Sequence, residues 1–141
     1  MKKMIVDASV MIKWVAGDPV EADQEQAMML LQAWMRGELE LMAPTLWLYE
    51  AGNFLGRHLS QAAEEKLTML LNLGIKSLHL TPAMCRLCLT WMRERAVTFF
   101  DAAYLAAAVE TGGSLVTADG KFAQRMKECG PICLLSEVNL D

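Results

Sequence analysis

Four acidic residues in a largely apolar chain are the residues best suited to chemistry. Asp7 and Asp119 each follow a short apolar run. Glu50 and Asp101 each lie in a segment with the residue pattern of a helix. Two carboxylates about 4 Å apart repel each other by about 4 kcal/mol at an effective dielectric constant of 20. If the fold gathers these acids, a hard divalent cation such as Mg²⁺ or Mn²⁺ would relieve the repulsion.

Carboxylates that hold divalent cations suit phosphodiester hydrolysis, because one ion can activate water and a second can stabilise the leaving oxygen. Hydroxyl and amide side chains near the acids could orient the carboxylates, and we expect this role for Ser9, Asn53 and Thr117. Each acid taken alone also has a structural explanation as a turn residue, a helix cap or an exposed side chain. The joint placement of the acids therefore carries the hypothesis.

Short apolar runs alternate with helical patterns along the chain. The pattern predicts strands over 3–7, 39–43, 75–80, 114–118 and 132–135. It predicts helices over 10–15, from Pro19 to the stop at Gly37, and over 44–59, 60–74, 82–95, 97–109 and 121–129. Such alternation favours a single α/β domain over residues 1–141, with a parallel sheet of about five strands.

Three hydroxyl residues are expected to cap helices. Ser9 is placed before the first helix, Ser60 before the fourth and Thr98 before the helix over 97–109. The last of these helices is alanine-rich and apolar nearly all round, which predicts that it is buried.

The expected sheet explains how distant acids could meet. Ligands of open parallel sheets bind beyond the carboxyl ends of the strands. Asp7 ends the first predicted strand and Asp119 ends the fourth, so both are expected at that edge. In the helix over 44–59, Glu50, Asn53 and Arg57 share one face, so the neighbours of Glu50 are polar.

Composition narrows the class of protein. Hydrophobic residues make up 54% and charged residues 21% of the 141 residues, which indicates a globular chain. The net charge of −4 argues against binding nucleic acid through a generally basic surface, although two divalent ions would bring it to zero. No apolar run is long enough to span a bilayer, and we expect a cytoplasmic protein with no membrane partner.

The cysteines and histidines are interpreted as structural. Cys85 and Cys88 fall within a helical pattern without a glycine between them, so we expect buried reduced thiols here and in the pair Cys129 and Cys133. A zinc site is the alternative for these four residues. Nothing in the sequence places His58 or His79 beside other donors.

The ordered acidic motifs resemble those of PIN-domain nucleases, and most of all the VapC toxins of VapBC toxin–antitoxin pairs. The resemblance covers nearly the whole chain and rests on Asp7-Ala-Ser9, Leu48-Tyr-Glu-Ala-Gly-Asn53, Phe100-Asp-Ala-Ala-Tyr-Leu-Ala106 and Val116-Thr-Ala-Asp119. It implies a three-layer α/β/α fold and an Mg²⁺- or Mn²⁺-dependent endoribonuclease. It also implies a homodimer whose acidic pocket is blocked by a small VapB-like antitoxin.

Carried over position by position, the family's acidic quartet falls on Asp7, Glu50, Asp101 and Asp119 as metal-binding catalytic residues. Ser9, Asn53 and Thr117 match its frequent polar neighbours. Basic residues near these motifs are candidates to contact RNA phosphates, and they are Lys13, Arg57, Lys121 and Arg125.

Three other functions remain open at this point. A PIN-type nuclease could act on DNA or in RNA maturation. A phosphoryl-accepting receiver domain would also cluster acids at strand ends, but it would place a second acid beside Asp7, and there is none. A non-catalytic scaffold would keep the fold and fail to bind Mn²⁺.

Overall fold

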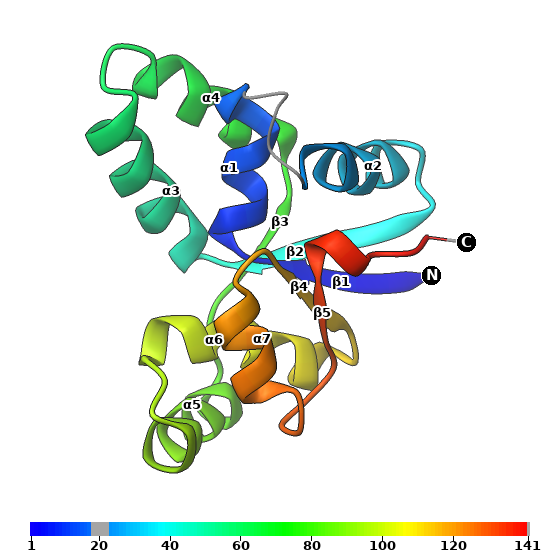
Figure 1. Ribbon diagram of the computed structural model, residues 1–141, viewed down its shortest axis with the longest axis vertical. Coiled ribbons are helices and arrows are strands. Elements are labelled where there is room, and N and C mark those ends of the chain that lie inside the picture. Colours follow the sequence, from blue (N-terminus) through cyan, green and yellow to red (C-terminus); the bar gives the residue numbers. More distant parts are fainter. Residues whose placement is uncertain (18–22, 141) are drawn as a thin grey trace.

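A five-stranded parallel sheet forms the centre of the protein (Figure 1). The computed structural model describes residues 1–17 and 23–140. The strands lie in the order β3-β2-β1-β4-β5, and all four neighbouring pairs are parallel. Their bounds are β1 Lys2–Val6, β2 Leu39–Pro44, β3 Lys76–Leu78, β4 Ser114–Thr117 and β5 Ile132–Leu134. The α/β class and the parallel five-stranded sheet are therefore confirmed.

Helices cover both faces of the sheet and give three layers, with α1–α4 on one side and α5–α7 on the other (Figure 1). Side chains of β1 alternate between two cores, since Met4 and Val6 pack with α1–α4 and Ile5 packs with α5–α7. The helices are α1 Ala8–Ala16, α2 Gln24–Met35, α3 Leu46–His58, α4 Ala63–Leu73, α5 Pro82–Arg95, α6 Phe99–Thr111 and α7 Gly120–Met126.

The strand order places a topological switch point between β1 and β4. From β1 the chain moves outward through β2 to β3, and then returns to the other side of β1 for β4 and β5. Gly113 permits this return, because a Cβ at that position would lie 2.8 Å from the Lys3 carbonyl oxygen. Ligands of open α/β sheets bind in the crevice at the carboxyl ends of the strands where the order reverses. Asp7 directly follows β1. Ala118 directly follows β4, and Asp119 comes next.

The alanine-rich helix α6 is buried as predicted. Its residues from Ala102 to Ala108 are all buried, and small side chains let it lie close to the sheet and to α5. Thr98 is its N-cap and accepts a hydrogen bond from Asp101 N at 3.1 Å, which confirms the predicted cap. This helix fixes the position of Asp101 at its first turn.

Two of the predicted caps are wrong. Asp7, not Ser9, caps α1: its side chain accepts from Val10 N, and Ser9 lies within the first turn. The fourth helix begins at Ala63 with Ala62 at the N-cap position, instead of at Ser60. A short carboxylate directly after a strand reaches the free N–H groups of the next helix, and this contact displaces the serine at α1.

Several element boundaries also differ from the prediction. Strand β3 covers three residues instead of 75–80, and α7 ends at Met126, before the predicted end at 129. The prediction that Pro19 opens the second helix falls outside the described residues, and α2 begins at Gln24. The predicted ranges were too long because apolar side chains continue the sequence pattern past the last backbone hydrogen bond of each element.

The four cysteines are free thiols. Cys88 is buried in the core under α5–α7, where burial raises its pKa to about 11. The other three, Cys85, Cys129 and Cys133, are only half-buried, so the prediction of buried thiols is wrong for them. Among the described residues, no helix is long and apolar enough to cross a bilayer.

Candidate active site

Asp7 is held by hydrogen bonds to both of its carboxylate oxygens. Oδ1 accepts from the Ser9 hydroxyl at 2.5 Å and from Val10 N at 3.3 Å. Oδ2 accepts from the hydroxyl of Thr117, the last residue of β4. The carboxylate of one strand end is therefore tied to the end of the neighbouring strand.

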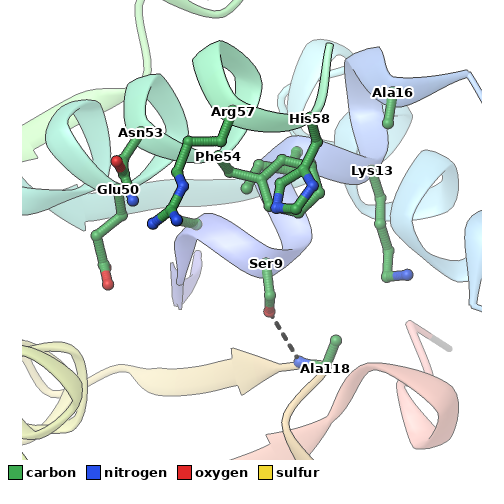
Figure 2. A pocket seen from close by; sticks show the side chains of 11 residues that line it. Ser9, Lys13, Ala16, Glu50, Asn53, Phe54, Arg57, His58 and Ala118 are labelled. Atoms are coloured by element: carbon green, nitrogen blue, oxygen red, sulfur yellow. Dashed lines mark hydrogen bonds between the residues drawn. The ribbon is translucent and has the colours of Figure 1, made fainter.

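The two hydroxyl groups are themselves fixed by backbone donors. Thr117 is completely buried, and its Oγ1 accepts from Asp119 N at 3.0 Å. The Ser9 hydroxyl accepts from Ala118 N at 3.3 Å (Figure 2). Because each hydroxyl accepts from an N–H group, its own proton is directed at Asp7. These contacts orient the Asp7 carboxylate in a single way.

Glu50 on α3 is held by a residue of another helix. The Tyr104 hydroxyl of α6 donates to Glu50 Oε1 at 2.5 Å, and Tyr104 is only 3% exposed. Within the described residues, this tyrosine is the hydrogen-bond partner of Glu50, and Asn53 is not. Asn53 instead lines a cavity beside Glu50.

Asp101 and Asp119 form a second pair of neighbouring acids. They line a cavity of about 240 Å³ between the α5–α6 connection and α7, with Lys121 and Arg125 on its wall. Asp119 also caps α7, since its Oδ1 accepts from Phe122 N at 3.0 Å. Arg125 donates to the Ala96 carbonyl oxygen at 3.1 Å, so this arginine has a structural contact as well.

The acids interact electrostatically as one group. Burial raises the pKa of Asp7, Glu50 and Asp101 above their usual values. The negative charges of Asp101 and Asp7 raise the pKa of Glu50 further, and Asp119 does the same to Asp101. The hydroxyl groups of Ser9, Thr117, Tyr104 and Thr98 oppose these shifts by donating to the carboxylates. The fold therefore keeps like charges close together at a desolvated site.

The donor set of these residues suits a divalent cation. All four supply oxygen ligands, and a cation would stabilise the ionised forms that burial and mutual repulsion disfavour. Among residues 1–17 and 23–140, no three Asp, Glu, His or Cys side chains come together as a ready-made ligand group. Mg²⁺ is commonly bound by one or two carboxylates and keeps several waters, so pairs of these acids meet its requirements.

A larger cavity of about 530 Å³ lies between α1 and α3. Figure 2 shows side chains that line it. Ser9, Glu50 and Ala118 belong to its wall, so it is continuous with the acidic site. Two of the predicted basic residues, Lys13 and Arg57, line it. The four predicted basic residues thus divide equally between the two cavities.

Sequence reasoning missed two residues of the site. Tyr104 lies three residues after Asp101 and therefore on the same face of α6, a spacing that could have indicated a role beside the acids. His58 was interpreted as structural, yet it lines the larger cavity and packs on Phe54 with ring centroids 4.6 Å apart. Its spacing of eight residues from Glu50 places both on one face of α3.

Solved structures with the same fold include three from different organisms. PAE2754 of Pyrobaculum aerophilum is 27% identical, with a TM-score of 0.66 and coverage of 95% of this chain and 84% of that chain. VapC20 of Mycobacterium tuberculosis, described as a toxin that cleaves the sarcin-ricin loop, is 21% identical, with a TM-score of 0.63 and coverage of 86% and 93%. VapBC-1 of nontypeable Haemophilus influenzae is 16% identical, with a TM-score of 0.64 and coverage of 96% and 99%.

No curated protein sequence matches this chain. A family model does match: the model of the PIN domain covers residues 4–127, which include all four acids and the whole switch point between β1 and β4. The chain belongs to the PIN domain family.

Proposed function

We propose that this protein is a divalent-metal-dependent endoribonuclease that uses Mg²⁺ or Mn²⁺ and acts as the toxin of a toxin–antitoxin pair. One observation carries the proposal: near the switch point, neighbouring carboxyl groups repel one another. They are Asp7, Glu50, Asp101 and Asp119. VapC20, which shares the fold, is described as a toxin that cleaves the sarcin-ricin loop, and this supports RNA as the proposed substrate.

The residues of the chain have separate roles in this proposal. Divalent-metal chemistry at such acids consists of activating water and stabilising the leaving oxygen of the phosphodiester. Ser9 and Thr117 keep the Asp7 carboxylate aimed in one direction, and Tyr104 does the same for Glu50. A ligand whose carboxylate is already oriented loses less conformational entropy on binding a cation, which is why such supporting contacts raise affinity.

The basic residues are proposed to hold the RNA backbone. Lys13 and Arg57 line the cavity that includes Glu50, and Lys121 and Arg125 line the cavity that includes two of the other acids. A strand of RNA that passes the acids would thus meet cations on both sides of the scissile bond. Contacts to phosphate position the strand without reading its sequence.

An antitoxin and a second copy of the chain are the proposed protein partners. VapBC-1, which shares the fold, carries the name of the VapBC pairs that the acidic motifs resemble, and this supports a small VapB-like antitoxin for the present protein. We propose a homodimer on the strength of the family resemblance. Size measurement in solution, with and without a co-expressed antitoxin, would test both partners.

Cleavage of labelled RNA by the purified protein tests the proposed activity. We expect cleavage with Mg²⁺ or Mn²⁺, no cleavage with a chelator, and a loss of at least about 100-fold in Asp7→Asn and in Asp119→Asn. Glu94→Gln, which removes an exposed acid of α5 that lines neither of the two cavities, serves as the control and should stay active. Cleavage that survives both aspartate substitutions, or that prefers DNA of the same sequence, would overturn the proposal.

A further inference from the structure

The larger cavity contains an exposed pair of aromatic rings that the acidic site does not use. Phe54 and His58 of α3 lie with ring centroids 4.6 Å apart and planes inclined by 41°. Phe54 remains 39% exposed although it lines a cavity, and His58 is exposed as well. Neighbouring aromatic rings that stay exposed in a cavity are costly unless a ligand covers them, so these rings indicate a binding site for a flat group.

Positive charge surrounds the aromatic pair. Arg57 lies next to His58 on α3, and Lys13 lines the cavity from α1 (Figure 2). In the part of the chain that the structure describes, no hydrogen bond or ion pair engages the Arg57 guanidinium. A planar guanidinium beside exposed rings matches a ligand that carries both an aromatic ring and a phosphate. The net charge of the chain is −4, so this local positive charge is not a property of the whole surface.

We propose that this cavity is a subsite for one unpaired nucleobase of the RNA, which stacks on the Phe54–His58 pair while Arg57 holds its phosphate. The inference rests on the proposed function and adds a requirement to it: a nucleotide next to the cleaved bond must be unpaired. Glu50 and Ser9 line the same cavity, which places the bound base directly beside the acids. The volume of about 530 Å³ lies within the range of small-ligand pockets.

The charges favour RNA over a protein segment as the occupant. A stacked base needs only an accessible ring face, so an aromatic pair accepts any base, and single strands are bound in this way together with basic side chains. A peptide side chain would cover the rings equally well, but it would not supply the phosphate that Arg57 and Lys13 can neutralise. An RNA ligand would cover the aromatic rings with a base and neutralise the basic side chains with a phosphate.

The test measures affinity for a fluorescent single-stranded RNA in chelator, where no cleavage takes place. We expect Phe54→Leu to weaken the affinity roughly 5- to 50-fold and Phe54→Trp to preserve it, since stacking needs a flat ring. Tyr49→Leu is the matched control: Tyr49 is an aromatic residue of the same helix, 74% exposed, that does not line the cavity. Thermal unfolding of each variant would show whether the fold is intact.

A scan with abasic nucleotides identifies the stacked base. Removing the base at one position of the RNA should weaken binding to the unchanged protein as much as Phe54→Leu does. At that position alone, Phe54→Leu should cause no further loss, because the two changes remove the same contact. Arg57→Gln should weaken binding to all RNAs and lower the salt dependence, with partial rescue in Arg57→Lys.

Two results would overturn the inference. One is equal affinity of Phe54→Leu and Tyr49→Leu for every RNA. The other is that Phe54→Leu loses affinity for a co-expressed antitoxin and keeps its affinity for RNA. If cleavage still requires Asp7 and a metal ion in either case, the proposed function stands and only the base subsite fails. If the scan succeeds and no RNA is cleaved, the base subsite stands and the proposed activity fails.

Discussion

The strand side and the helix side of the candidate site hold their acids in different ways. Asp7 follows a central strand, and the sheet register that pairs Val6 with Val116 places its carboxylate against Thr117. Glu50 lies on α3, and one hydroxyl group, that of Tyr104 on α6, fixes it. Hydrogen bonds of the sheet thus set one half of the site, whereas packing between helices from opposite layers sets the other half.

This difference predicts a rigid strand side and a more adjustable helix side. On the strand side, donors from the first turn of α1 and from the end of β4 reach both oxygens of one carboxylate. On the helix side, losing a single hydroxyl leaves Glu50 without a fixed direction. Substitutions in the two halves should therefore differ in size, and the following predictions run from the largest expected effect to the smallest.

Thr117→Val should be the most damaging of the conservative changes. It keeps the shape of a completely buried side chain and removes both the donor to Asp7 and the acceptor of Asp119 N. We expect a loss of about 2 kcal/mol in the free energy of unfolding and a fall in nuclease activity of about 100-fold. Urea unfolding and RNA cleavage measure the two effects.

Thr111→Val is the control for this substitution. Thr111 lies at the end of α6, away from the acids, and its hydroxyl donates to the Ala107 carbonyl oxygen at 2.7 Å. Its activity should equal that of the unchanged protein. A Thr117→Val variant that is no less active than Thr111→Val would mean that the contact of Thr117 with Asp7 does not contribute to activity.

Tyr104→Phe should have a smaller effect, because it removes one hydrogen bond and leaves the buried ring in place. We expect a loss of about 1 kcal/mol in the free energy of unfolding. We also expect activity to fall about 10-fold, because the metal ion binds more weakly. Measuring the Mn²⁺ concentration that gives half of the maximal activity would reveal that origin. Tyr49→Phe, at a tyrosine that is 74% exposed, should change nothing.

The stability of the metal-free protein should depend on pH in the direction opposite to that of most acids. Burial raises the pKa of Asp7, Glu50 and Asp101 above the usual 3.8, 4.5 and 3.8, so between the usual and the raised values the folded state binds more protons than the unfolded state. The free energy of unfolding should therefore fall as the pH rises through that interval. Thermal unfolding at a series of pH values measures the fall.

Asp7→Asn and saturating Mg²⁺ should each reduce this pH-dependent fall. The substitution removes one of the three raised groups, and the cation stabilises the charged forms. An equally steep fall in Asp7→Asn and in the unchanged protein would mean that the acids of the site do not cause it.

Ala96→Gly should give the smallest effect, and it is a gain. Ala96 ends α5 with φ at 54°, a left-handed conformation that costs a non-glycine residue about 1–2 kcal/mol. Glycine relieves that cost and loses about 0.5–1 kcal/mol of backbone entropy, so we expect a net gain of about 0.5 kcal/mol. A melting temperature equal to or below that of the unchanged protein would contradict this prediction.

The strand half of the site could be predicted from the sequence, and much of the helix half could not. Asp7 and Asp119 come directly after apolar runs, and parallel strands end at one edge, so their placement at that edge follows from a local pattern. The contact between Glu50 and Tyr104 joins residues 54 positions apart on helices from different layers. No periodicity encodes such a contact, because it depends on how the two layers pack against the sheet.

The wrong caps have a related cause. Ser9 and Ser60 are good capping residues by type, but Asp7 competes with Ser9 for the start of α1, and the turn before α4 continues to Ala62. Residue preferences give the existence of a helix more reliably than its first residue. The misplaced cap mattered for the site, because a serine that does not cap α1 is free to orient Asp7.

Calorimetric titration of the metal-free protein with Mn²⁺ tests the central claim most directly, namely that the two halves together form a cation site. We predict saturable binding that weakens at least about 10-fold both in Asp7→Asn on the strand side and in Asp101→Asn on the helix side. Absence of saturable binding, or binding that neither substitution weakens, would contradict it.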